Sequence, residues 1–388
     1  MKYLFIHTHP IQYFAPLYAF LHHKGMDLEV WYGDAGNSSG RHFDHEFQQE
    51  VKWDIPLLEG YPYRIFENRG NPNGKRNYYS YDNPGMLEAL EKEPPALVVV
   101  HGWNYKTYVA LLRNARRYGH RLAFRGETNW DMEKQRPAYL KYFRHTALGF
   151  LLKDVDHFFY IGEKSRLFYK YLNVPDKKLH FTPYAVDNHR FRAQKQELDR
   201  AALREAYGLQ PGDMVFLFTG KFIPKKKPVE ILRAFSLLHA ENVKLLMVGE
   251  GVLRDQMESV IQASGLQNSV TLTGFVNQSR IPEFYAMADV FIMASDFGET
   301  WGLSVNEAMN FSLPLILSDR TGCHADLLKP GGNGLLVPSG DIDALRHAMS
   351  AFADMEKEEI RLQGSRSLEI VENYSFRRIY ETLEAIAQ

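Results

Sequence analysis

Residues 295–309 have the sequence SDFGETWGLSVNEAM, which places two carboxylates, Glu299 and Glu307, eight positions apart around Gly302. The apolar run at 288–294 predicts a short buried strand, and the apolar spacing after Gly302 predicts a buried helix. Glu299 is therefore expected on the loop between strand and helix, and Glu307 one to two turns into the helix.

The start of this predicted helix is suited to an anion. Its first turn consists of Gly302, Leu303 and Ser304. Backbone N–H groups without an intrahelical partner and the positive end of the helix dipole meet there, and together they favour a diphosphate. Glu307 could then accept hydrogen bonds from ribose hydroxyls, while Glu299 faces a sugar at the other end of the diphosphate. The alternative is an ordinary helix start, where acidic residues only complement the dipole.

With its interior glycine, the preceding Ala-Asp-Val-Phe strand and the following Ala-Met, this element resembles the signature of retaining glycosyltransferases of family 4. The resemblance implies the GT-B fold: two Rossmann-like, doubly wound α/β domains that face each other across a cleft, and a C-terminal helix that crosses back to the first domain. It also implies a nucleotide-diphosphate sugar as co-substrate, with no cofactor.

Length and composition agree with two domains. The chain has 388 residues, 45% of them hydrophobic and 24% charged, more than one ordinary core accommodates. No run approaches the roughly 20 apolar residues of a membrane span, and a strand at 3–6 without an apolar leader leads us to expect a cytoplasmic protein. A lone cysteine, Cys323, excludes an intramolecular disulfide and a cysteine-based zinc site.

Charge differs between the halves of the chain. Residues 1–190 contain 26 Lys and Arg against 21 Asp and Glu, a net +5, whereas residues 191–388 contain 20 against 26, a net −6. This asymmetry could orient the first half toward an anionic acceptor or the inner face of a membrane, as a peripheral protein. Ordinary variation explains it equally well, and we expect no nucleic-acid partner.

Apolar runs alternate with helical patterns along the whole chain, which predicts doubly wound parallel sheets. The predicted strands are 2–7, 28–32, 96–101, 121–124 and 157–160 in the first half, and 214–219, 243–248, 270–272, 289–293 and 313–317 in the second. Helices are predicted at 11–24, 105–118 and 197–206, and a long loop at 70–79. The predicted domains are 1–190 on the acceptor side and 191–370 on the donor side, followed by a terminal helix in 371–388 that packs on the first.

A basic loop follows the predicted strand at 214–219. Lys221 and Lys226 stand there at the carboxyl end of the sheet, where open α/β sheets bind ligands. In the family, a basic residue after the glycine and a lysine five positions later contact the phosphates, and these positions correspond to Lys221 and Lys226. A solvated basic loop is the alternative, and the favoured one for Lys225 and Lys227.

Two further turns resemble family segments that line the nucleotide. Gly249 and Gly251 end the strand at 243–248, and Phe275 and Val276 follow the strand at 270–272. Glycines permit close backbone approach, although packing alone is at least as good an explanation of such turns.

Two Asp-x-Asp triplets require a decision about metal. Asp154 and Asp156 precede the strand at 157–160, while Asp341 and Asp343 start a helix, which is ordinary capping. We assign neither triplet to a metal. Lysines and helix-terminal amides take the place of a cation in this arrangement, so we predict chemistry that is independent of metal.

The first domain resembles the family less. Its opening loop lacks the glycine-rich turn of many relatives, and His9, Gln12 or the backbone near Pro10 is expected to substitute at the donor phosphate. The family histidine that contacts the donor sugar is replaced by the segment that contains Arg125 and Glu127. We expect these two residues and His101 in the cleft as catalytic residues, against structural pairing as the alternative for each.

The sequence thus predicts a retaining, metal-independent glycosyltransferase of hexosyltransferase type that acts in glycan or glycoconjugate biosynthesis. Its acceptor would be a carbohydrate, lipid-linked or other hydroxyl compound. Glu299 would orient the sugar, and Lys221, Lys226 and the helix-start amides would stabilise the departing phosphate. The alternatives are an inverting GT-B transferase or nucleotide-sugar epimerase, and a non-catalytic subunit that binds nucleotide sugar.

Overall fold

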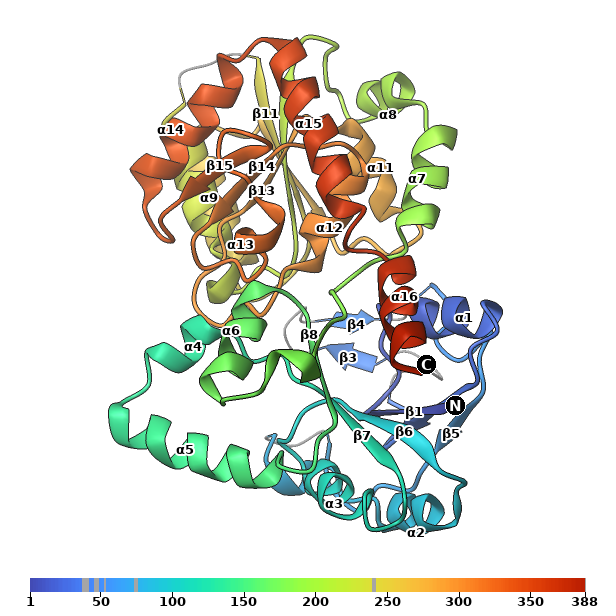
Figure 1. Ribbon diagram of the computed structural model, residues 1–388. Coiled ribbons are helices and arrows are strands. Elements are labelled where there is room, and N and C mark those ends of the chain that lie inside the picture. Colours follow the sequence, from blue (N-terminus) through green and yellow to red (C-terminus); the bar gives the residue numbers. More distant parts are fainter. Residues whose placement is uncertain (37–41, 45–48, 52–53, 73–75, 239–241, 388) are drawn as a thin grey trace. The chain divides into compact units, whose positions relative to one another are not determined.

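The computed structural model describes residues 1–36, 54–72, 76–238 and 242–387, and the backbone of 42–44 and 49–51. Contacts divide the chain into two compact units (Figure 1). The first consists of Met1–Arg41, Pro56–Tyr184 and Phe376–Gln388, and the second of His42–Ile55 and Ala185–Ser375. Residues 73–75 of the predicted loop at 70–79 lie outside the described residues.

The first unit is built on a seven-stranded sheet with the order β5-β2-β1-β6-β7-β8-β9, in which every neighbouring pair is parallel. Its strands are β1 (Lys2–His7), β2 (Leu28–Tyr32), β5 (Tyr63–Ile65), β6 (Ala96–Val100), β7 (Arg121–Arg125), β8 (His157–Tyr160) and β9 (Leu179–Phe181). Its helices are α1 (Ala15–His23), η1 (Tyr78–Ser80), α2 (Pro84–Lys92), α3 (Lys106–Asn114), α4 (Trp130–Lys134), α5 (Ala138–Leu151), α6 (Glu163–Tyr171), η2 (Asp176–Lys178) and α16 (Phe376–Ala387).

The second unit contains a six-stranded parallel sheet with the order β12-β11-β10-β13-β14-β15. Its strands are β10 (Met214–Thr219), β11 (Val243–Val248), β12 (Val270–Gly274), β13 (Val290–Met293), β14 (Leu315–Ser318) and β15 (Gly334–Val337). Its helices are α7 (Asn188–Glu197), α8 (Arg200–Ala206), η3 (Pro224–Lys226), α9 (Pro228–Ser236), α10 (Arg254–Ala263), α11 (Ile281–Met287), α12 (Leu303–Asn310), α13 (His324–Leu327), α14 (Ile342–Ala353) and α15 (Lys357–Val371). A two-stranded antiparallel ribbon, β3 (His42–Asp44) with β4 (Gln49–Val51), is assigned to the same unit.

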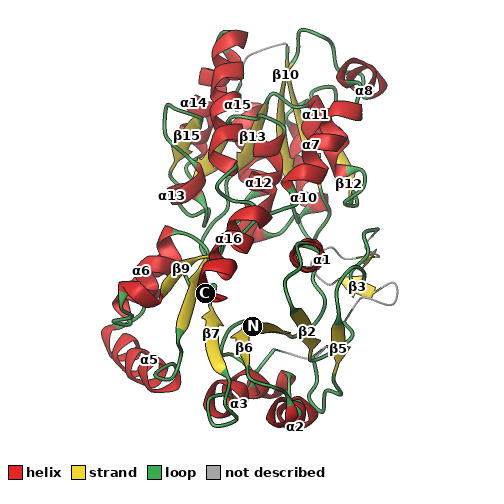
Figure 2. Cartoon of the chain, turned by 45° about the vertical axis from the view of Figure 1, so that its right-hand side comes forward, coloured by secondary structure: helices red, strands yellow, loops and turns green. Residues whose placement is uncertain are grey.

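Helices cover both faces of the second sheet (Figure 2). One layer contains α9, α10 and α14, and the other contains α7, α8, α11, α12 and α15. Two-sided burial explains why the strands are continuous apolar runs, as is usual for parallel sheets.

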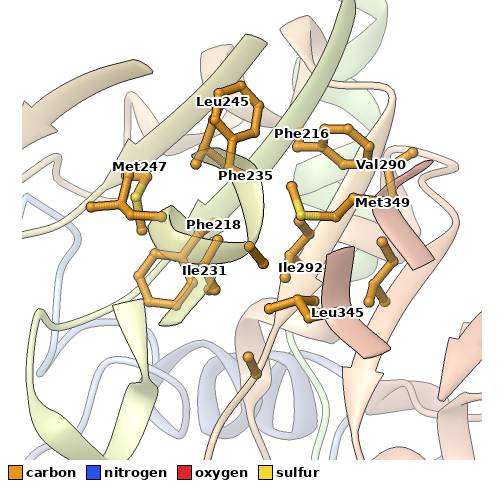
Figure 3. Close-up of a cluster of buried hydrophobic side chains, with 14 of the residues drawn as sticks. Phe216, Phe218, Ile231, Phe235, Leu245, Met247, Val290, Ile292, Leu345 and Met349 are labelled. Atoms are coloured by element: carbon orange, nitrogen blue, oxygen red, sulfur yellow. The ribbon is translucent and has the colours of Figure 1, made fainter. Parts of the chain in front are cut away.

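The core under α9 and α14 shows how the strand period builds this packing (Figure 3). Alternate residues of β10, β11 and β13 contribute side chains to one cluster, because successive side chains of a strand point to opposite faces. The two residues from each strand are Phe216 and Phe218 of β10, Leu245 and Met247 of β11, and Val290 and Ile292 of β13. They pack with the helix residues Ile231, Phe235, Leu345 and Met349. Burial of each such side chain contributes roughly 1.5–3 kcal/mol.

The C-terminal helix α16 belongs to the first unit, as the sequence predicted. The Tyr3 hydroxyl of β1 donates to the carbonyl of Leu383 at 2.5 Å, and Thr382 Oγ1 donates to the carbonyl of Phe181 at 2.9 Å. The strand β1 and the strand β9 are therefore both tied to the last helix of the chain.

The predicted helix at 197–206 is wrong in its extent. Two helices, α7 and α8, meet at Leu198 and Asp199. Asp199 accepts hydrogen bonds from the N–H groups of Ala201 and Ala202 at 2.9 and 3.1 Å and so starts a new helix as its N-cap. The predicted helix at 11–24 starts only at Ala15, one residue before a proline that favours a helix start.

Candidate functional site

The loop between β13 and α12 lies at the carboxyl edge of the second sheet, as predicted. Gly302 begins α12 in the left-handed region with φ of 100°. A Cβ atom at this position would lie 2.7 Å from Met293 Sδ. The left-handed backbone conformation therefore favours glycine, and a side chain here would also displace Met293.

Glu299 on this loop is held by a cation from the neighbouring loop. Lys226 Nζ lies 2.5 Å from Glu299 Oε2, and Ser295 Oγ donates to the same oxygen at 3.2 Å. The residue is only 8% exposed. Burial raises the pKa of Glu299, but the charges of Lys226 and Lys225 and the hydrogen bonds outweigh it, so the pKa lies below its usual value. Glu299 is thus an ionised carboxylate at neutral pH.

The lysine loop after β10 and the Glu299 loop are joined at further points. The N–H of Asp296 donates to the carbonyl of Lys225 at 2.7 Å, and Lys227 Nζ lies 3.2 Å from Asp296 Oδ2. Hence Lys227, predicted to be a solvated residue, forms an ion pair. Lys221 is half-buried at the start of the same loop. The structure therefore brings Lys226 and Glu299 together directly.

Glu307 lies in the second turn of α12 and is buried, with 2% exposure. The Tyr285 hydroxyl of α11 donates to Glu307 Oε2 at 2.7 Å and also bonds with Thr219 Oγ1 at 2.9 Å. The role of Tyr285 was not predicted, since no motif marks this residue among the apolar residues of α11. A hydroxyl contact to a buried carboxylate fixes the orientation of that carboxylate.

The first turn of α12 is braced against β10. Ser304 Oγ lies 3.5 Å from the carbonyl of Thr219, and Leu303 and Ser304 are half-buried. Thus the end of β10, the start of α12 and the lysine loop lie at the same edge of the sheet. This edge combines N–H groups of a helix start with lysine ammonium groups, the elements of an anion site.

The glycine turn after β11 packs closely on the lysine loop. A Cβ atom at Gly249 would lie 1.9 Å from the carbonyl oxygen of Gly220, and one at Gly251 would lie 2.6 Å from that of Phe222. Close packing, the alternative explanation of these turns, therefore accounts for glycine at both positions. Phe275 and Val276 follow β12 at the same edge and are half-buried.

A third loop, after β14, supports the Glu299 loop and was not predicted. Ser318 Oγ donates to the carbonyl of Ser295 at 2.5 Å, and Thr321 Oγ1 donates to that of Met293 at 3.1 Å. Both hydroxyl groups satisfy backbone carbonyls that leave the sheet between β13 and Glu299. The two residues are fully buried, so this loop fixes the path of the Glu299 loop.

In the first unit, His101 follows β6 at the carboxyl edge and stacks on His7, the last residue of the adjacent β1, with ring centroids 3.8 Å apart. Its Nδ1 donates to the carbonyl of Ile6 at 3.1 Å. Burial and the nearby Arg125 lower the pKa of His101 to about 3. This histidine is therefore neutral at pH 7, with its proton on Nδ1. The role of His7, which bonds with the Tyr18 hydroxyl, was not predicted.

Arg125 ends β7, next to β6, and is 4% exposed. Its Nη1 donates to Thr182 at the carbonyl (2.9 Å) and at Oγ1 (3.1 Å), and its guanidinium lies over the rings of Phe14 and Tyr184. These contacts supply the structural pairing that was the alternative for Arg125. Glu127 is exposed and accepts a hydrogen bond from the Tyr184 hydroxyl.

The opening loop between β1 and α1 contains His9 and Gln12. His9 Nδ1 lies 2.9 Å from Thr8 Oγ1. The side-chain oxygen of Gln12 is buried and has no hydrogen-bond partner among the described residues. Their predicted contact with the donor phosphate stays a prediction.

The Asp-x-Asp triplets occupy structural positions. Asp156 pairs with Arg116 at 3.2 Å and accepts from the N–H of Leu122 at 3.0 Å. Asp341 caps α14 by accepting from the N–H of Ala344 at 2.9 Å. In the part of the chain that the structure describes, no group of three or more His, Cys, Asp or Glu residues has the arrangement of a metal site.

A cavity of about 1420 Å³ lies at the opposite, amino edge of the second sheet. Its wall contains Arg200 and Arg204, which bond with Asp289 Oδ1 and the carbonyl of Asp213, both at 2.5 Å. Because these cations are already paired with neighbouring groups, we assign no ligand to the cavity.

Two Rossmann-like units with parallel sheets of seven and six strands define the GT-B fold. HepE from Anabaena, solved with UDP and glucose, matches with a TM-score of 0.71 and 15% identity over 100% of this chain and 99% of its own. Sucrose-phosphate synthase from Thermosynechococcus elongatus matches with a TM-score of 0.71 and 17% identity over 100% and 98%. The predicted fold is thereby confirmed.

Sequence comparison finds similarity in the second unit. Residues 199–364 match the model of glycosyl transferases group 1. An alpha-D-kanosaminyltransferase of Streptomyces kanamyceticus is 29% identical over 47% of this chain and 46% of its own length. A D-inositol 3-phosphate glycosyltransferase of Nocardia farcinica is 26% identical over 57% and 50%. The chain spans about half the length of the curated relatives it matches.

Proposed function

We propose that this protein is a retaining glycosyltransferase that transfers a sugar from a nucleotide-diphosphate sugar to a hydroxyl acceptor. One observation carries the proposal: the ion pair of Lys226 with Glu299 beside the start of α12, in the same domain as the buried Glu307. The matches to a group 1 domain and to structures solved with UDP support a nucleotide-sugar donor.

In the proposed reaction, the bond between the sugar C1 and the β-phosphate oxygen breaks, and its electron pair stays on the phosphate. The acceptor oxygen bonds to C1 on the same face, and the leaving phosphate oxygen takes the acceptor proton. Lys226, Lys221 and the N–H groups of Gly302 to Ser304 stabilise the charge that grows on the phosphate.

Within this scheme Glu299 has two tasks. As an ionised carboxylate it accepts hydrogen bonds from sugar hydroxyls, and through Lys226 it orients the cation for the phosphate. A single ion pair thus links the sugar end and the phosphate end of the donor. Glu307, fixed by Tyr285, is assigned to the ribose hydroxyls.

Lysines and amides supply the positive charge in this proposal, and the reaction is proposed to proceed without metal.

We assign the first unit to the acceptor, which is a carbohydrate, lipid-linked or other hydroxyl compound of glycan or glycoconjugate biosynthesis, and we place the protein in the cytoplasm. None of the described helices is long and apolar enough to cross a bilayer.

The test starts with thermal unfolding of the purified protein in the presence of a panel of nucleoside diphosphates. A ligand at 100 times its dissociation constant adds about 2.7 kcal/mol of stability. The matching nucleotide sugar is then incubated with candidate acceptors, and NMR follows the anomeric proton. A product with the donor's anomeric configuration supports retention, whereas the opposite configuration indicates an inverting enzyme.

Turnover of the donor also separates a transferase from a non-catalytic subunit. Slow hydrolysis of the nucleotide sugar without acceptor is expected, because water can replace the acceptor hydroxyl. Binding without any turnover, even on long incubation with acceptors, would contradict the proposal.

A further inference from the structure

The helix α5 of the first unit presents its apolar side chains to solvent. Five large apolar residues of this helix are between 42% and 69% exposed, which are Tyr139, Leu140, Tyr142, Phe143 and Phe150. Three of them, Tyr139, Phe143 and Phe150, are spaced by four and seven residues and therefore share one face. We call the five residues the aromatic face of α5. Contiguous exposed apolar surface of this kind marks a site of interaction.

The opposite side of α5 is anchored to the first unit by polar and charged residues. Arg144 Nε donates to the buried Glu133 at 3.0 Å, and its guanidinium lies 4.9 Å from the centre of the Trp103 ring. His145 Nε2 donates to the carbonyl of Tyr171 at 3.1 Å. Leu148 of the same side is buried in the core of the unit, so α5 is anchored by one apolar and several polar residues while its largest apolar side chains face solvent. Specific contacts hold the helix in this orientation.

The segment at 134–153 is basic, and Asp131, Glu133 and Asp154 stand just outside it. Residues 134–153 contain five Lys and Arg and no Asp or Glu. Lys153 follows the helix and lies with its Nζ 4.9 Å from the centre of the Phe150 ring. Arg136 precedes the helix, is exposed, and pairs with Glu133 at 3.2 Å. Cations therefore border the aromatic face at both ends.

Helix α5 lies at the outer margin of the first unit in both views (Figures 1 and 2). A long helix with an aromatic face and basic flanks fits the interface of a lipid bilayer, where rings enter the headgroup region and cations meet anionic lipids. A second copy of the chain fits less well, because face-to-face pairing would bring two basic segments together.

We propose that α5 docks the protein on an anionic lipid surface through its aromatic face. The inference does not rest on the proposed function, since it uses neither the donor site nor glycosyl transfer. It names a specific surface through which the net positive first half of the chain would bind an anionic membrane. Both the apolar contact and the charge are required, so binding should respond to each separately.

Co-sedimentation with vesicles tests the proposal. The purified protein is mixed with vesicles of phosphatidylcholine alone, or with vesicles that contain about one quarter phosphatidylglycerol. We expect at least tenfold tighter binding to the anionic vesicles. Phe143→Ser with Phe150→Ser should lower that binding at least tenfold, while Tyr79→Ser, an exposed aromatic residue away from α5, should leave it unchanged.

The charge component has its own variants. Arg136→Gln and Lys153→Gln should each weaken binding to anionic vesicles about fivefold, the equivalent of about 1 kcal/mol per cation. If the double serine variant lacks a cooperative thermal transition, Tyr142→Ser on the same face replaces it.

Three results would overturn the proposal. The protein could stay in the supernatant with both kinds of vesicle, or the serine variants could bind like the wild type. Alternatively, sedimentation equilibrium without lipid could show a dimer that the serine variants convert to monomer, which would make the aromatic face an interface between copies. Loss of vesicle binding in the serine variants, with Tyr79→Ser unaffected, would support it.

Discussion

Removal of the Lys226 ammonium should destabilise the second unit and slow turnover. In Lys226→Ala, Glu299 keeps Ser295 as a partner but loses the cation 2.5 Å away. The two side chains are only 15% and 10% exposed. Loss of one partner of a buried ion pair costs about 3–5 kcal/mol, and the remaining contacts reduce this to about 2–3 kcal/mol. For a unit of this size the midpoint of thermal unfolding should fall by roughly 4–12 °C.

The pH dependence of this loss has a defined sign. The pKa of Glu299 is below its usual value in the folded protein, so the ion pair contributes stability above the unfolded pKa, about 4.3. That contribution disappears as the pH falls through the lower folded pKa. The midpoint difference between the wild type and Lys226→Ala should therefore be full at pH 7 and shrink below about pH 4.

Differential scanning calorimetry at several pH values measures this difference, and Lys225→Ala is the matched control. Among the described residues Lys225 forms no ion pair with Glu299 and acts on that carboxylate only through its charge, so the control should show a smaller effect. Turnover should fall on the order of 10²-fold in Lys226→Ala and in Lys221→Ala. A midpoint difference that is independent of pH, or equal turnover losses at all three lysines, would refute the reasoning.

Three further predictions concern other parts of the account. Tyr285→Phe removes the hydroxyl that holds Glu307 and should weaken the affinity for nucleoside diphosphate about fivefold or more. Titration calorimetry measures this affinity. An unchanged value would show that Tyr285 does not position the carboxylate. His101→Ala and Glu127→Gln should lower turnover but change nucleoside diphosphate affinity by less than about threefold, well under the tenfold that 1.4 kcal/mol represents. The pKa of His101 is about 3, so this residue does not titrate near neutrality. The pH–rate profiles of the wild type and His101→Ala should therefore have the same shape near pH 7. Activity should persist in excess chelator, and its loss with recovery on addition of magnesium or manganese would contradict the metal-independent proposal.

The strands were predictable where burial on both faces makes them apolar along their whole length. The ends of β1, β2, β8, β10 and β11 agree with the sequence prediction. The edge strands β5, β9 and β15 were missed, because they are three or four residues long and partly exposed. Such strands leave no apolar run in the sequence, and their partners in the sheet define them.

In the site, the sequence predicted the residues whose positions depend on a single loop or helix. It did not predict the contacts between residues of different elements. The position of Glu299 before Gly302 follows from local pattern. The contact of Tyr285 with Glu307 joins α11 and α12, and the stacking of His7 on His101 depends on β1 lying beside β6. The orientation of α5 is a similar case, because periodicity shows that apolar residues share a face but not which way that face points.

The central claim is that the second unit binds a nucleotide-diphosphate donor with Glu307 on the ribose. Titration calorimetry of UDP, GDP and ADP against the wild type and Glu307→Gln tests it most directly. Hydrogen bonds to a charged acceptor contribute about 1.5–3 kcal/mol, so one nucleotide should bind the wild type and bind the folded Gln variant at least about tenfold more weakly. Equal affinity in the two proteins, or no binding of any nucleoside diphosphate to the folded wild type, would contradict the account.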